Sequence, residues 1–595
     1  MNLPPILSRL PSIAIDRLDP DTLGRLEVLH QAGFLEPALA QVPPDAPPET
    51  WETLIVDLAS CDLDWISGLR QALQSPPARW DPGDLQPVAA LSLEDPRRDS
   101  WRDLGMQVLA QGGVASLVFA GGAATRFFSE AAGDPEVEAL RDRLGTHPPK
   151  GLYPLYPVLR RNFLEVFLAE ALEAGLAVGR LPPVVWMTSR QTDRAIRRWL
   201  EEDYRESFPR DLVRLIPQQE HPRLDPQGRL VVDPEGHLVR TGDGHGGVFR
   251  ALCRTDDGPA PRDLLRQQGI RTLVMHNVDN ARSRPFEPSR LGVHGSFGFA
   301  FTMTVAPRAH VREKVGLVVR HAGTGRIEVI EYSVCPPEVA DARDPDGRPR
   351  FRLGHLNTNL VDLAAIRPDL PRTLYTGKKV AVGDRQVETA SHEMLNQHLS
   401  GLLPPDRVGV LEVPREDFFL PTKSLRGEDS LARTREALVQ GHRDRLRDAG
   451  AQVDPSAWIE LHPCLAEGPW PLGTLRDWEV GPGSTLALAA VHGPSGAPPL
   501  GAGLRLGEGA TLVVDADRPR GPLAMDPETR QVREDPAEAG HLALGRGVVV
   551  APGARIRVRI RGDGCLVIPD GALLSGEADL VVPEGETRIW SSGIE

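Results

Sequence analysis

A short apolar segment that runs into two adjacent glycines constrains this chain more than any other part of its sequence. Residues 116–127 read Ser-Leu-Val-Phe-Ala-Gly-Gly-Ala-Ala-Thr-Arg-Phe. The apolar half predicts a buried strand. Gly121 and Gly122 then let the backbone turn and approach a ligand with no Cβ in the way. The segment therefore predicts a sheet in which this strand ends at a ligand-binding turn.

Two cations accompany this turn. Arg126 belongs to the segment itself, and Lys150 follows a loop later in the sequence Pro-Lys-Gly. Backbone N–H groups combined with two cations suit a polyphosphate, which accepts charge-assisted hydrogen bonds. The spacing fits neither Gly-x-x-x-x-Gly-Lys-Ser/Thr nor Gly-x-Gly-x-x-Gly, so a P-loop or a dinucleotide-binding turn fits poorly. The alternative is an ordinary strand and turn with basic residues present by chance.

Strands and helices are predicted to alternate from about residue 106 to residue 335. The predicted strands span 116–120, 184–188, 212–217, 272–278, 299–306, 315–320 and 326–332, with helices at 162–174 and 192–202. Apolar strands that alternate with helices predict an α/β fold with a mostly parallel sheet covered by helices. Ligands of such folds bind beyond the carboxyl ends of the strands, where the two-glycine turn lies.

The chain has 595 residues, too many for one hydrophobic core, so several domains are expected. We predict an N-terminal helical region over 1–105, an α/β domain over 106–477 and a small C-terminal β domain over 478–595. In the last domain, four units of apolar strand, Pro or Gly turn and apolar strand repeat unevenly, which fits either β-helical coils or an irregular β-sandwich. These units carry no clustered Lys, His or Asp, so we expect them to serve stability or assembly of a homo-oligomer.

Composition excludes several classes of partner. The formal net charge of −14 disfavours binding to nucleic acid, whose backbone is negatively charged. Five cysteines lie far apart without metal-binding spacing, which favours reduced thiols in the cytosol. No segment approaches the apolar length of a membrane span. We therefore predict a cytoplasmic protein with neither nucleic acid nor a membrane as partner.

The sequence Gly-Gly-x-x-Thr-Arg followed by Pro-Lys-Gly resembles the signature of sugar-nucleotide pyrophosphorylases. Further motifs in the same order extend this resemblance over about residues 105–468 to the UDPGP family of uridylyltransferases. That family includes UDP-glucose, UDP-sugar and UDP-N-acetylhexosamine pyrophosphorylases. The resemblance implies a Rossmann-like, GT-A-like nucleotidyltransferase domain with a mixed sheet. It also implies UTP and a sugar 1-phosphate as substrates and Mg²⁺ as cofactor.

The resemblance implies where the nucleotide binds. Gln218, which follows a predicted strand, would read the uracil, because a side-chain amide offers the donor and the acceptor that the imide edge of uracil requires. The loop over 242–247 resembles the family's Gly-His-Gly or Gly-Asn-Gly loop. Its Gly244 and His245 would pack on the uracil and the sugar, and a flat ring against backbone requires residues without Cβ.

The resemblance also implies the catalytic groups. Asp279 would bind Mg²⁺, which takes one or two carboxylates and fills its remaining positions with phosphates and water. The alternative is an aspartate that caps a strand in a turn. Arg126 and Lys150 would neutralise phosphate charge together with Lys423, which ends the sequence Phe-Leu-Pro-Thr-Lys and would reach the phosphates from the opposite side. The sugar 1-phosphate is already an anion, so its attack on the α-phosphorus of UTP needs no general base.

Four further residues resemble the family's sugar-binding positions: Gly316, Glu331, Asn357 and Asn359. The carboxylate of Glu331 can accept two hydroxyl hydrogen bonds, as a hexose requires. The sequence Asn-Thr-Asn and His245 are similar to glucose-specific members, whereas the segment around 411–423 is more similar to the N-acetylhexosamine and broad-specificity members. We therefore expect glucose 1-phosphate or hexose 1-phosphates broadly, with N-acetylglucosamine 1-phosphate as the alternative.

The chain also departs from the family pattern. Phe127 and Phe128 stand where leucine and glycine are usual, and an insertion over 129–147 precedes Lys150. The insertion would form a lid or a surface loop. These departures motivate a second hypothesis, that the chain is a non-catalytic nucleotide-sugar binder or assembly subunit, although such a binder needs fewer phosphate-binding cations.

Overall fold

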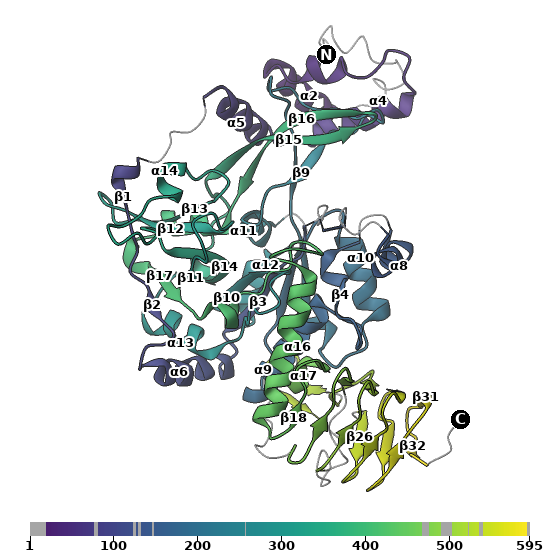
Figure 1. Ribbon diagram of the computed structural model, residues 1–595. Coiled ribbons are helices and arrows are strands. Elements are labelled where there is room, and N and C mark those ends of the chain that lie inside the picture. The colour runs from purple at the N-terminus through teal and green to yellow at the C-terminus, as the bar shows by residue number, and fades with distance from the viewer. Residues whose placement is uncertain are drawn as a thin grey trace.

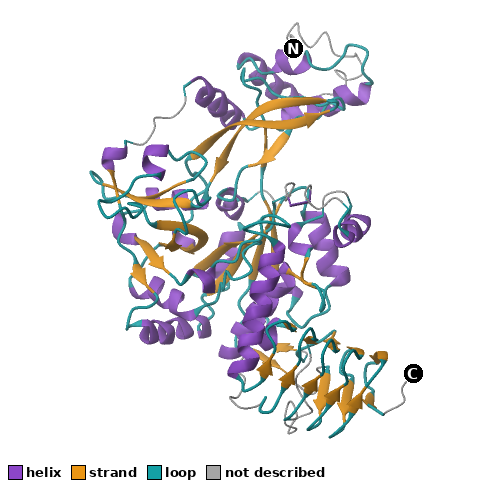
Figure 2. Cartoon of the chain, viewed as in Figure 1, coloured by secondary structure: helices purple, strands orange, loops and turns teal. Residues whose placement is uncertain are grey.

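The computed structural model of this chain describes residues 19–75, 81–122, 127–128, 133–145, 148–255, 258–466, 475–489, 502–521, 523–534 and 540–591. A helical unit near the N-terminus and a stack of strands near the C-terminus lie at opposite ends of a central sheet with helices around it (Figure 1). Figure 2 shows the same division by secondary structure. Within the described ranges, no helix is both long and apolar enough to cross a membrane.

The central sheet has eleven strands, eight of them in the order β2-β17-β11-β14-β10-β3-β6-β7, with β12, β13 and β1 attached beside β14. The strands are β1 (Leu85–Gln86), β2 (Leu91–Ser92), β3 (Val114–Phe119), β6 (Val184–Thr188), β7 (Val213–Pro217), β10 (Thr272–Asn277), β11 (Phe301–Pro307), β12 (Gly316–His321), β13 (Ile327–Ile330), β14 (Leu353–Asp362) and β17 (Val408–Glu412). β3 pairs in parallel with β10 and β6, whereas β14 runs antiparallel to β10 and β11. The sheet is therefore mixed, with a parallel half around β3, and the predicted α/β class is confirmed.

Both faces of this sheet are covered. Successive residues of β3 alternate between two hydrophobic clusters: Leu117 and Phe119 belong to one, and Val114 and Val118 to the other. The surrounding helices are α6 (Arg98–Ala110), α9 (Phe163–Val178), α10 (Asp193–Arg198), α11 (Gly247–Cys253), α12 (Pro261–Gln267), α13 (Pro288–Ser296) and α16 (Leu431–Asp448). A strand buried on both faces reads as a continuous apolar run, which is why the sequence pattern locates β3.

Helix α9 illustrates how local sequence sets the element bounds. The side chain of Asn162 accepts from the backbone N–H of Glu165, and the Glu165 carboxylate accepts from the backbone N–H of Asn162, forming a capping box. Gly179 ends the helix in the left-handed conformation at φ 72°. The helix thus spans four residues more at its C-terminal end than the predicted helix over 162–174.

The N-terminal helical unit is joined to a long hairpin from the middle of the chain. Its helices are α2 (Pro20–Gln31), α3 (Leu35–Leu39), α4 (Pro48–Ala59) and α5 (Leu63–Gln74), and the paired strands beside them are β8 (Glu220–Pro222), β9 (Arg240–Gly242), β15 (Arg372–Val382) and β16 (Arg385–Met394). Trp65 of α5 stacks on His221 of β8 with ring centroids 3.9 Å apart. Gly383, at φ 55°, and Asp384 form the two-residue turn of the β15–β16 hairpin. This hairpin was not among the predicted elements.

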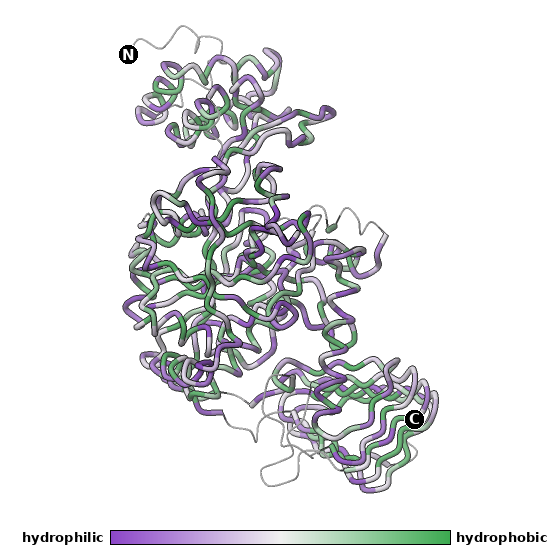
Figure 3. The backbone as a smooth tube through the Cα atoms, turned by 60° about the vertical axis from the view of Figure 1, so that its left-hand side comes forward, coloured by the Kyte–Doolittle hydropathy of each residue, from purple (hydrophilic) through white to green (hydrophobic). Residues whose placement is uncertain are grey.

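The C-terminal strands form three parallel sheets, two with five strands and one with three, to which successive coils add short strands. Their members are β18 (Gln452–Val453), β19 (Trp458–Leu461), β20 (Glu479–Val480), β21 (Thr485–Leu488), β22 (Arg505–Leu506), β23 (Thr511–Ala516), β26 (His541–Leu544), β27 (Val549–Val550), β28 (Arg555–Ile560), β29 (Cys565–Ile568), β30 (Leu573–Leu574), β31 (Glu577–Val582) and β32 (Thr587–Ile589). Parallel pairing of this kind makes a β-helix and not a β-sandwich. In Figure 3 hydrophobic positions line up from coil to coil.

The turns of the β-helix explain the repeated Pro/Gly sequence units. Gly509, Gly553, Gly571 and Gly585 adopt φ values of 64°, 69°, 69° and 73°, which glycine adopts without strain. The strands β18 and β19 already belong to the same sheets. The predicted boundary at 477/478 therefore falls inside the stack, and the predicted helical region over 1–105 likewise includes β1 and β2 of the central sheet.

Short elements complete the described chain: α8 (Pro135–Leu144), β4 (Pro154–Tyr156), β5 (Arg161–Asn162), α14 (Pro337–Ala340), α15 (Arg415–Phe418), α17 (Pro463–Ala466), β24 (Leu523–Met525) and β25 (Val532–Glu534). Of these, α8 occupies most of the insertion over 129–147. Its Val137 and Leu140 are buried, and Glu136 accepts hydrogen bonds from Tyr153 and Arg435. The described part of the insertion is thus a docked helix.

Candidate active site

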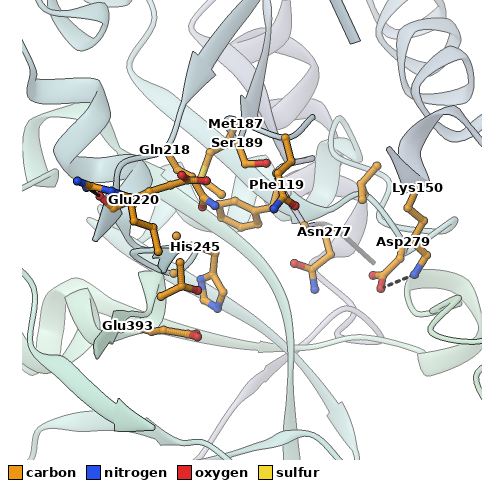
Figure 4. Close-up of a pocket in the computed structure, with 18 of the residues that line it drawn as sticks. Phe119, Lys150, Met187, Ser189, Gln218, Glu220, His245, Asn277, Asp279 and Glu393 are labelled. Carbon is orange, nitrogen blue, oxygen red and sulfur yellow. Dashed lines mark hydrogen bonds and ion pairs between the residues drawn. The ribbon is translucent and has the colours of Figure 1, made fainter. Parts of the chain in front are cut away.

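A cavity of about 570 Å³ lies at the carboxyl ends of the parallel strands around β3. One side, here called the sheet wall, is formed by residues at these strand ends and the turns after them, including Gly121, Lys150, Gln218 and Asp279. The other side, the hairpin wall, comes from β8–β9 and β15–β16 and includes Arg223, Lys378 and Glu393. The predicted position of a ligand site therefore coincides with a cavity between two parts of the fold (Figure 4).

One end of the cavity holds a lysine–aspartate pair. Lys150 is only 6% exposed, and its Nζ lies 3.2 Å from Oδ2 of Asp279. The same ammonium group donates to the backbone carbonyl of Thr422 and lies 5.2 Å from the ring centroid of Phe127. Phe127, which departs from the family pattern, thus packs against this lysine. Lys150 lies between α8 and β4, and Asp279 follows β10, so two segments far apart in the sequence meet at this end of the cavity.

The segment Phe-Leu-Pro-Thr-Lys supports this end of the cavity from outside. Asn280 donates from Nδ2 to the carbonyl of Phe418 at 2.9 Å and accepts at Oδ1 from the backbone N–H of Leu420 at 2.8 Å. The backbone N–H of Thr422 donates to the carbonyl of Asp279 at 2.9 Å. These bonds fix the turn that carries the Asp279 carboxylate.

The three predicted catalytic cations therefore have different positions. Lys150 lines the cavity. Lys423 is not among the residues that line it; its Nζ pairs with Asp429 at 3.1 Å, and its side chain is 42% exposed. Arg126 lies outside the described residues, so its predicted role stays a prediction.

The opposite end of the cavity holds the amide of Gln218. Its backbone N–H donates to the carbonyl of Thr188 at 2.9 Å, which fixes the residue after β7. A Cβ at Gly242 would lie 2.1 Å from Nε2 of Gln218, so a larger residue there would require the Gln218 amide to move. Gly244, at φ 84°, lies against β16, where a Cβ would lie 2.3 Å from the carbonyl oxygen of Met394. The glycines of the predicted loop thus serve close packing on both sides, and both Gln218 and Gly244 line the cavity.

His245 lies in the middle of the cavity, 5.3 Å from the ring of Phe119 (Figure 4). Burial lowers the pKa of His245 to about 3, so the ring is neutral at physiological pH. Its Nδ1 faces the backbone N–H of Asn396 at 3.2 Å and therefore accepts a hydrogen bond. The proton of the neutral ring resides on Nε2.

The predicted sugar-binding residues are not among those that line the cavity. Glu331 accepts from Nε2 of Gln397 at 2.5 Å, and burial raises the pKa of Glu331. A Cβ at Gly316 would lie 3.2 Å from the same carboxylate. Asn357 donates to Asn277, which does line the cavity, and Asn359 is fully buried and donates to Asn396.

The charged residues of the hairpin wall were missed by the sequence reasoning. Arg223 donates to the hydroxyl groups of Thr241 at 2.9 Å and Thr389 at 3.2 Å, which connects β9 to β16. Burial raises the pKa of Glu393, while Arg223 and Lys378 oppose that rise. A signal was available in the polar–apolar alternation on both sides of the turn at Gly383, which is typical of a hairpin.

The residues present fit Mg²⁺ only together with a substrate. In the part of the chain that the structure describes, no group of three or more His, Cys, Asp or Glu side chains could hold a metal ion. Asp279 offers one carboxylate at the Lys150 end of the cavity, and the other lining carboxylates, Glu220 and Glu393, come from the hairpin wall. Mg²⁺ is commonly held by one or two carboxylates plus substrate phosphates, so this donor set suits a nucleotide-bound Mg²⁺.

Comparisons with known proteins give matches over more than half of the chain. A family model described as UTP–glucose-1-phosphate uridylyltransferase, UDPGP, matches residues 139–455. UDP-N-acetylglucosamine pyrophosphorylase of Saccharomyces cerevisiae is 26% identical over 384 residues, which cover 61% of this chain and 75% of the yeast protein. UDP-N-acetylhexosamine pyrophosphorylase-like protein 1 of Xenopus tropicalis is 27% identical over 403 residues, 63% of this chain and 74% of that protein.

A solved structure is similar in fold. The crystal structure of the uridine diphosphate N-acetylglucosamine pyrophosphorylase from Trypanosoma brucei matches with a TM-score of 0.60 and 20% identity. The match covers 76% of this chain and 94% of that one. The likeness shows that the two chains share a nucleotidyltransferase fold.

Proposed function

Since the chain belongs to the UDPGP family and is therefore a uridylyltransferase that makes UDP-sugars, we propose that it transfers the uridylyl group of UTP to an N-acetylhexosamine 1-phosphate. N-acetylglucosamine 1-phosphate is the first candidate, because the relatives described above are named for N-acetylglucosamine or N-acetylhexosamine. The glucose preference expected from His245 and the sequence Asn-Thr-Asn has no support among these relatives. The alternative sugar from the sequence reasoning is thus the better matched one.

The observation that carries this proposal is the arrangement of the sheet wall. A glycine-packed amide at Gln218 lies at one end of the cavity, and the Lys150–Asp279 pair lies at the other. This order suits a nucleotide with its base at Gln218 and its phosphates at Lys150. The amide would pair with the imide edge of uracil, and the ammonium group would neutralise phosphate oxygens.

The reaction would proceed by in-line displacement. A phosphate oxygen of the sugar 1-phosphate attacks the α-phosphorus of UTP, the bond to the β-phosphate oxygen breaks, and pyrophosphate leaves. Asp279, together with phosphate oxygens, would hold Mg²⁺, which when bound supplies charge neutralisation at the phosphates. Lys150 would stabilise the charge that increases on the leaving group, and no residue need remove a proton because the nucleophile is an anion.

Lys423 would bind a substrate phosphate only after its ammonium group leaves Asp429. Its ion pair with Asp429 is partly exposed, and such pairs are worth only about 0–1 kcal/mol. A substrate phosphate would therefore compete easily for the lysine. Arg126, which lies outside the described residues, would contribute a further positive charge.

The experiment is a pyrophosphate-release assay with UTP, Mg²⁺ and four sugar 1-phosphates: N-acetylglucosamine, N-acetylgalactosamine, glucose and galactose. We expect the highest kcat/KM with an N-acetylhexosamine 1-phosphate. A higher kcat/KM with glucose 1-phosphate would contradict the proposed sugar while leaving uridylyl transfer intact. No release with any of the four would contradict the proposed substrate class.

A further inference from the structure

Three of the predicted substrate-binding residues, His245, Asn357 and Asn359, meet at a side chain that no sequence motif singles out. This side chain is Asn396, which is fully buried in the turn after β16. Its Nδ2 lies 2.8 Å from Nδ1 of His245 and 2.8 Å from Oδ1 of Asn357. Its Oδ1 accepts from Nδ2 of Asn359 at 2.6 Å. One amide thus connects three separate segments of the chain.

The backbone determines which way this amide points. Because the backbone N–H of Asn396 donates to Nδ1 of His245, that nitrogen is an acceptor. Only the NH₂ group of the Asn396 side chain can therefore face it, and the amide oxygen must face Asn359. The neutral ring carries its proton on Nε2, and burial, with a pKa of about 3, keeps it neutral.

From this fixed point the hydrogen bonds run in one direction. His355 donates from Nε2 to Asn359 at 2.8 Å, and Asn359 donates to Asn396. Asn396 donates to Asn357, which donates to Oδ1 of Asn277 at 2.9 Å. Donors in such a chain polarise one another in a low-dielectric interior. This series of hydrogen bonds also holds Asn357 at φ 51°, a conformation that residues other than glycine rarely adopt.

The chain ends at two groups on the cavity surface. The oxygen of Asn277 is engaged by Asn357, so its NH₂ group is the part that can meet a ligand. At His245, which also lines the cavity, the group that can donate to a ligand is Nε2–H. Both residues lie between the Gln218 end and the Lys150–Asp279 end of the cavity (Figure 4).

We propose that Asn396 is a positioning residue: its backbone N–H commits His245, and its side-chain amide commits Asn277 through Asn357, to donate hydrogen bonds to substrate oxygens in the middle of the cavity. Preorganised neutral donors need no reorientation when charge increases on those oxygens, which favours the transition state. The identity of the oxygens, phosphate or sugar, rests on the proposed function. The direction of the hydrogen-bond chain does not.

The first test needs no substrate. Nitrogen NMR of the full-length protein with ¹⁵N-labelled histidine reports the tautomer of His245, assigned by the signal that disappears in His245→Asn. We expect a neutral ring protonated on Nε2, without titration between about pH 5 and 8. An Nδ1-protonated ring, or titration near the ordinary value of about 6.5, would overturn the proposal.

Two substitutions at Asn396 separate its contacts. Asn396→Asp places a carboxylate beside Nδ1 of His245, so we expect the imidazole proton to move to Nδ1 or the pKa of His245 to rise. Asn396→Ala keeps the backbone N–H and therefore the wild-type tautomer, but it breaks the link to Asn357 and Asn277. We expect both variants to lower kcat by about 10- to 100-fold, with a smaller change in the KM for UTP.

The matched control is Ser400→Ala. Ser400 is buried in the same turn and donates only to the carbonyl of Gln397 at 2.8 Å, so wild-type kcat and tautomer are expected. An Asn396→Asp variant with the wild-type tautomer and kcat would overturn the proposal. If that variant does not fold, the wild-type spectrum still decides. An inactive wild type with the Nε2-protonated ring would overturn the proposed function and support the positioning role. An active wild type with an Nδ1-protonated ring would support the proposed function and overturn the positioning role.

Discussion

The two walls of the cavity differ in how their residues are brought together. Most groups of the sheet wall lie just beyond strands of the eleven-stranded sheet, as Gln218 does after β7 and Asp279 after β10, whereas Lys150 lies between α8 and β4. The hairpin wall consists of charged side chains on two strand pairs that are far apart in sequence and pack on the N-terminal helices. The position of the sheet wall is set mainly by the ends of neighbouring strands. The hairpin wall forms only when segments far apart in the sequence pack together. We therefore expect the sheet wall to carry the reaction and the hairpin wall to adjust substrate affinity.

The largest expected effect is at the lysine–aspartate pair of the sheet wall. Lys150→Ala and Asp279→Asn should each lower kcat by about 100- to 1000-fold, because each removes a group that acts on the phosphates. The double variant should cost little more than either single one, since the two act on one transition state. Steady-state pyrophosphate release measures all three. Lys314→Ala, at an exposed lysine, is the control, and independent KM effects with unchanged kcat would contradict a catalytic role.

The base end of the sheet wall should show a smaller effect that falls on selectivity. Gln218→Ala should weaken UTP binding by about 1–3 kcal/mol and reduce the preference for UTP over other nucleoside triphosphates. Gly242→Ala should act in the same direction, because its Cβ would displace the Gln218 amide. Competition assays with CTP and ATP measure the preference. If it is unchanged in both variants, another residue reads the base.

The contribution of the His221–Trp65 contact, which supports the hairpin wall, to folding stability should depend on pH. Burial lowers the pKa of His221, which stacks on Trp65, to about 3, whereas an unfolded histidine has its ordinary value near 6.5. The folded pKa is the lower one, so this contribution to stability is fully present above about pH 6.5 and is lost as pH falls toward 3. At pH 5 the loss is on the order of 2 kcal/mol.

His221→Phe keeps an aromatic ring against Trp65 but cannot bind the proton. Its unfolding free energy, measured in urea, should therefore fall less than that of the wild type between about pH 7 and pH 5. Equal losses in the two proteins would exclude His221 as a source of the pH dependence. Each protein is compared with itself at the two pH values, so a constant difference in stability caused by the altered packing of Phe against Trp65 cancels.

The smallest expected effect is at the rim of the hairpin wall. Lys378 lines the cavity, and its neighbour Lys379 points to the opposite face of β15. Lys378→Ala should raise the KM for UTP or sugar 1-phosphate a few-fold with kcat nearly unchanged, because a partly exposed charge contributes only about 0.2–1 kcal/mol. Lys379→Ala is the matched control. Equal effects of the two variants would show that only net charge matters there.

The same contrast explains what the sequence could predict. The strands β3, β6, β7 and β10 were predicted to within one or two residues, because buried apolar runs ending at glycine or polar residues are local signals. Gln218 and Asp279 line the cavity, each just after such a strand. The expected roles of these two residues, and of His245 and Lys150, came from the resemblance to the family motifs.

Residues whose position depends on tertiary contacts were not predictable in this way. The role of Asn396 arises from segments around residues 245, 357 and 277 that converge only in the fold. Glu331 and Asn359 match family motifs but are not among the residues that line the cavity, since a motif identifies a residue and not the direction of its side chain. The boundary at 477/478 was placed where the β repeats become obvious, although β18 and β19 already belong to the β-helix.

The central claim is that one cavity orders the nucleotide along the sheet wall, with its base at Gln218 and its phosphates at Lys150 and Asp279. A crystal structure of the protein with UDP-N-acetylglucosamine and Mg²⁺ tests it most directly. We expect the uracil against Gly242 and within hydrogen-bonding distance of Gln218, and a diphosphate-bound metal ion at Asp279. A nucleotide bound in the reverse direction, or outside this cavity, would contradict it.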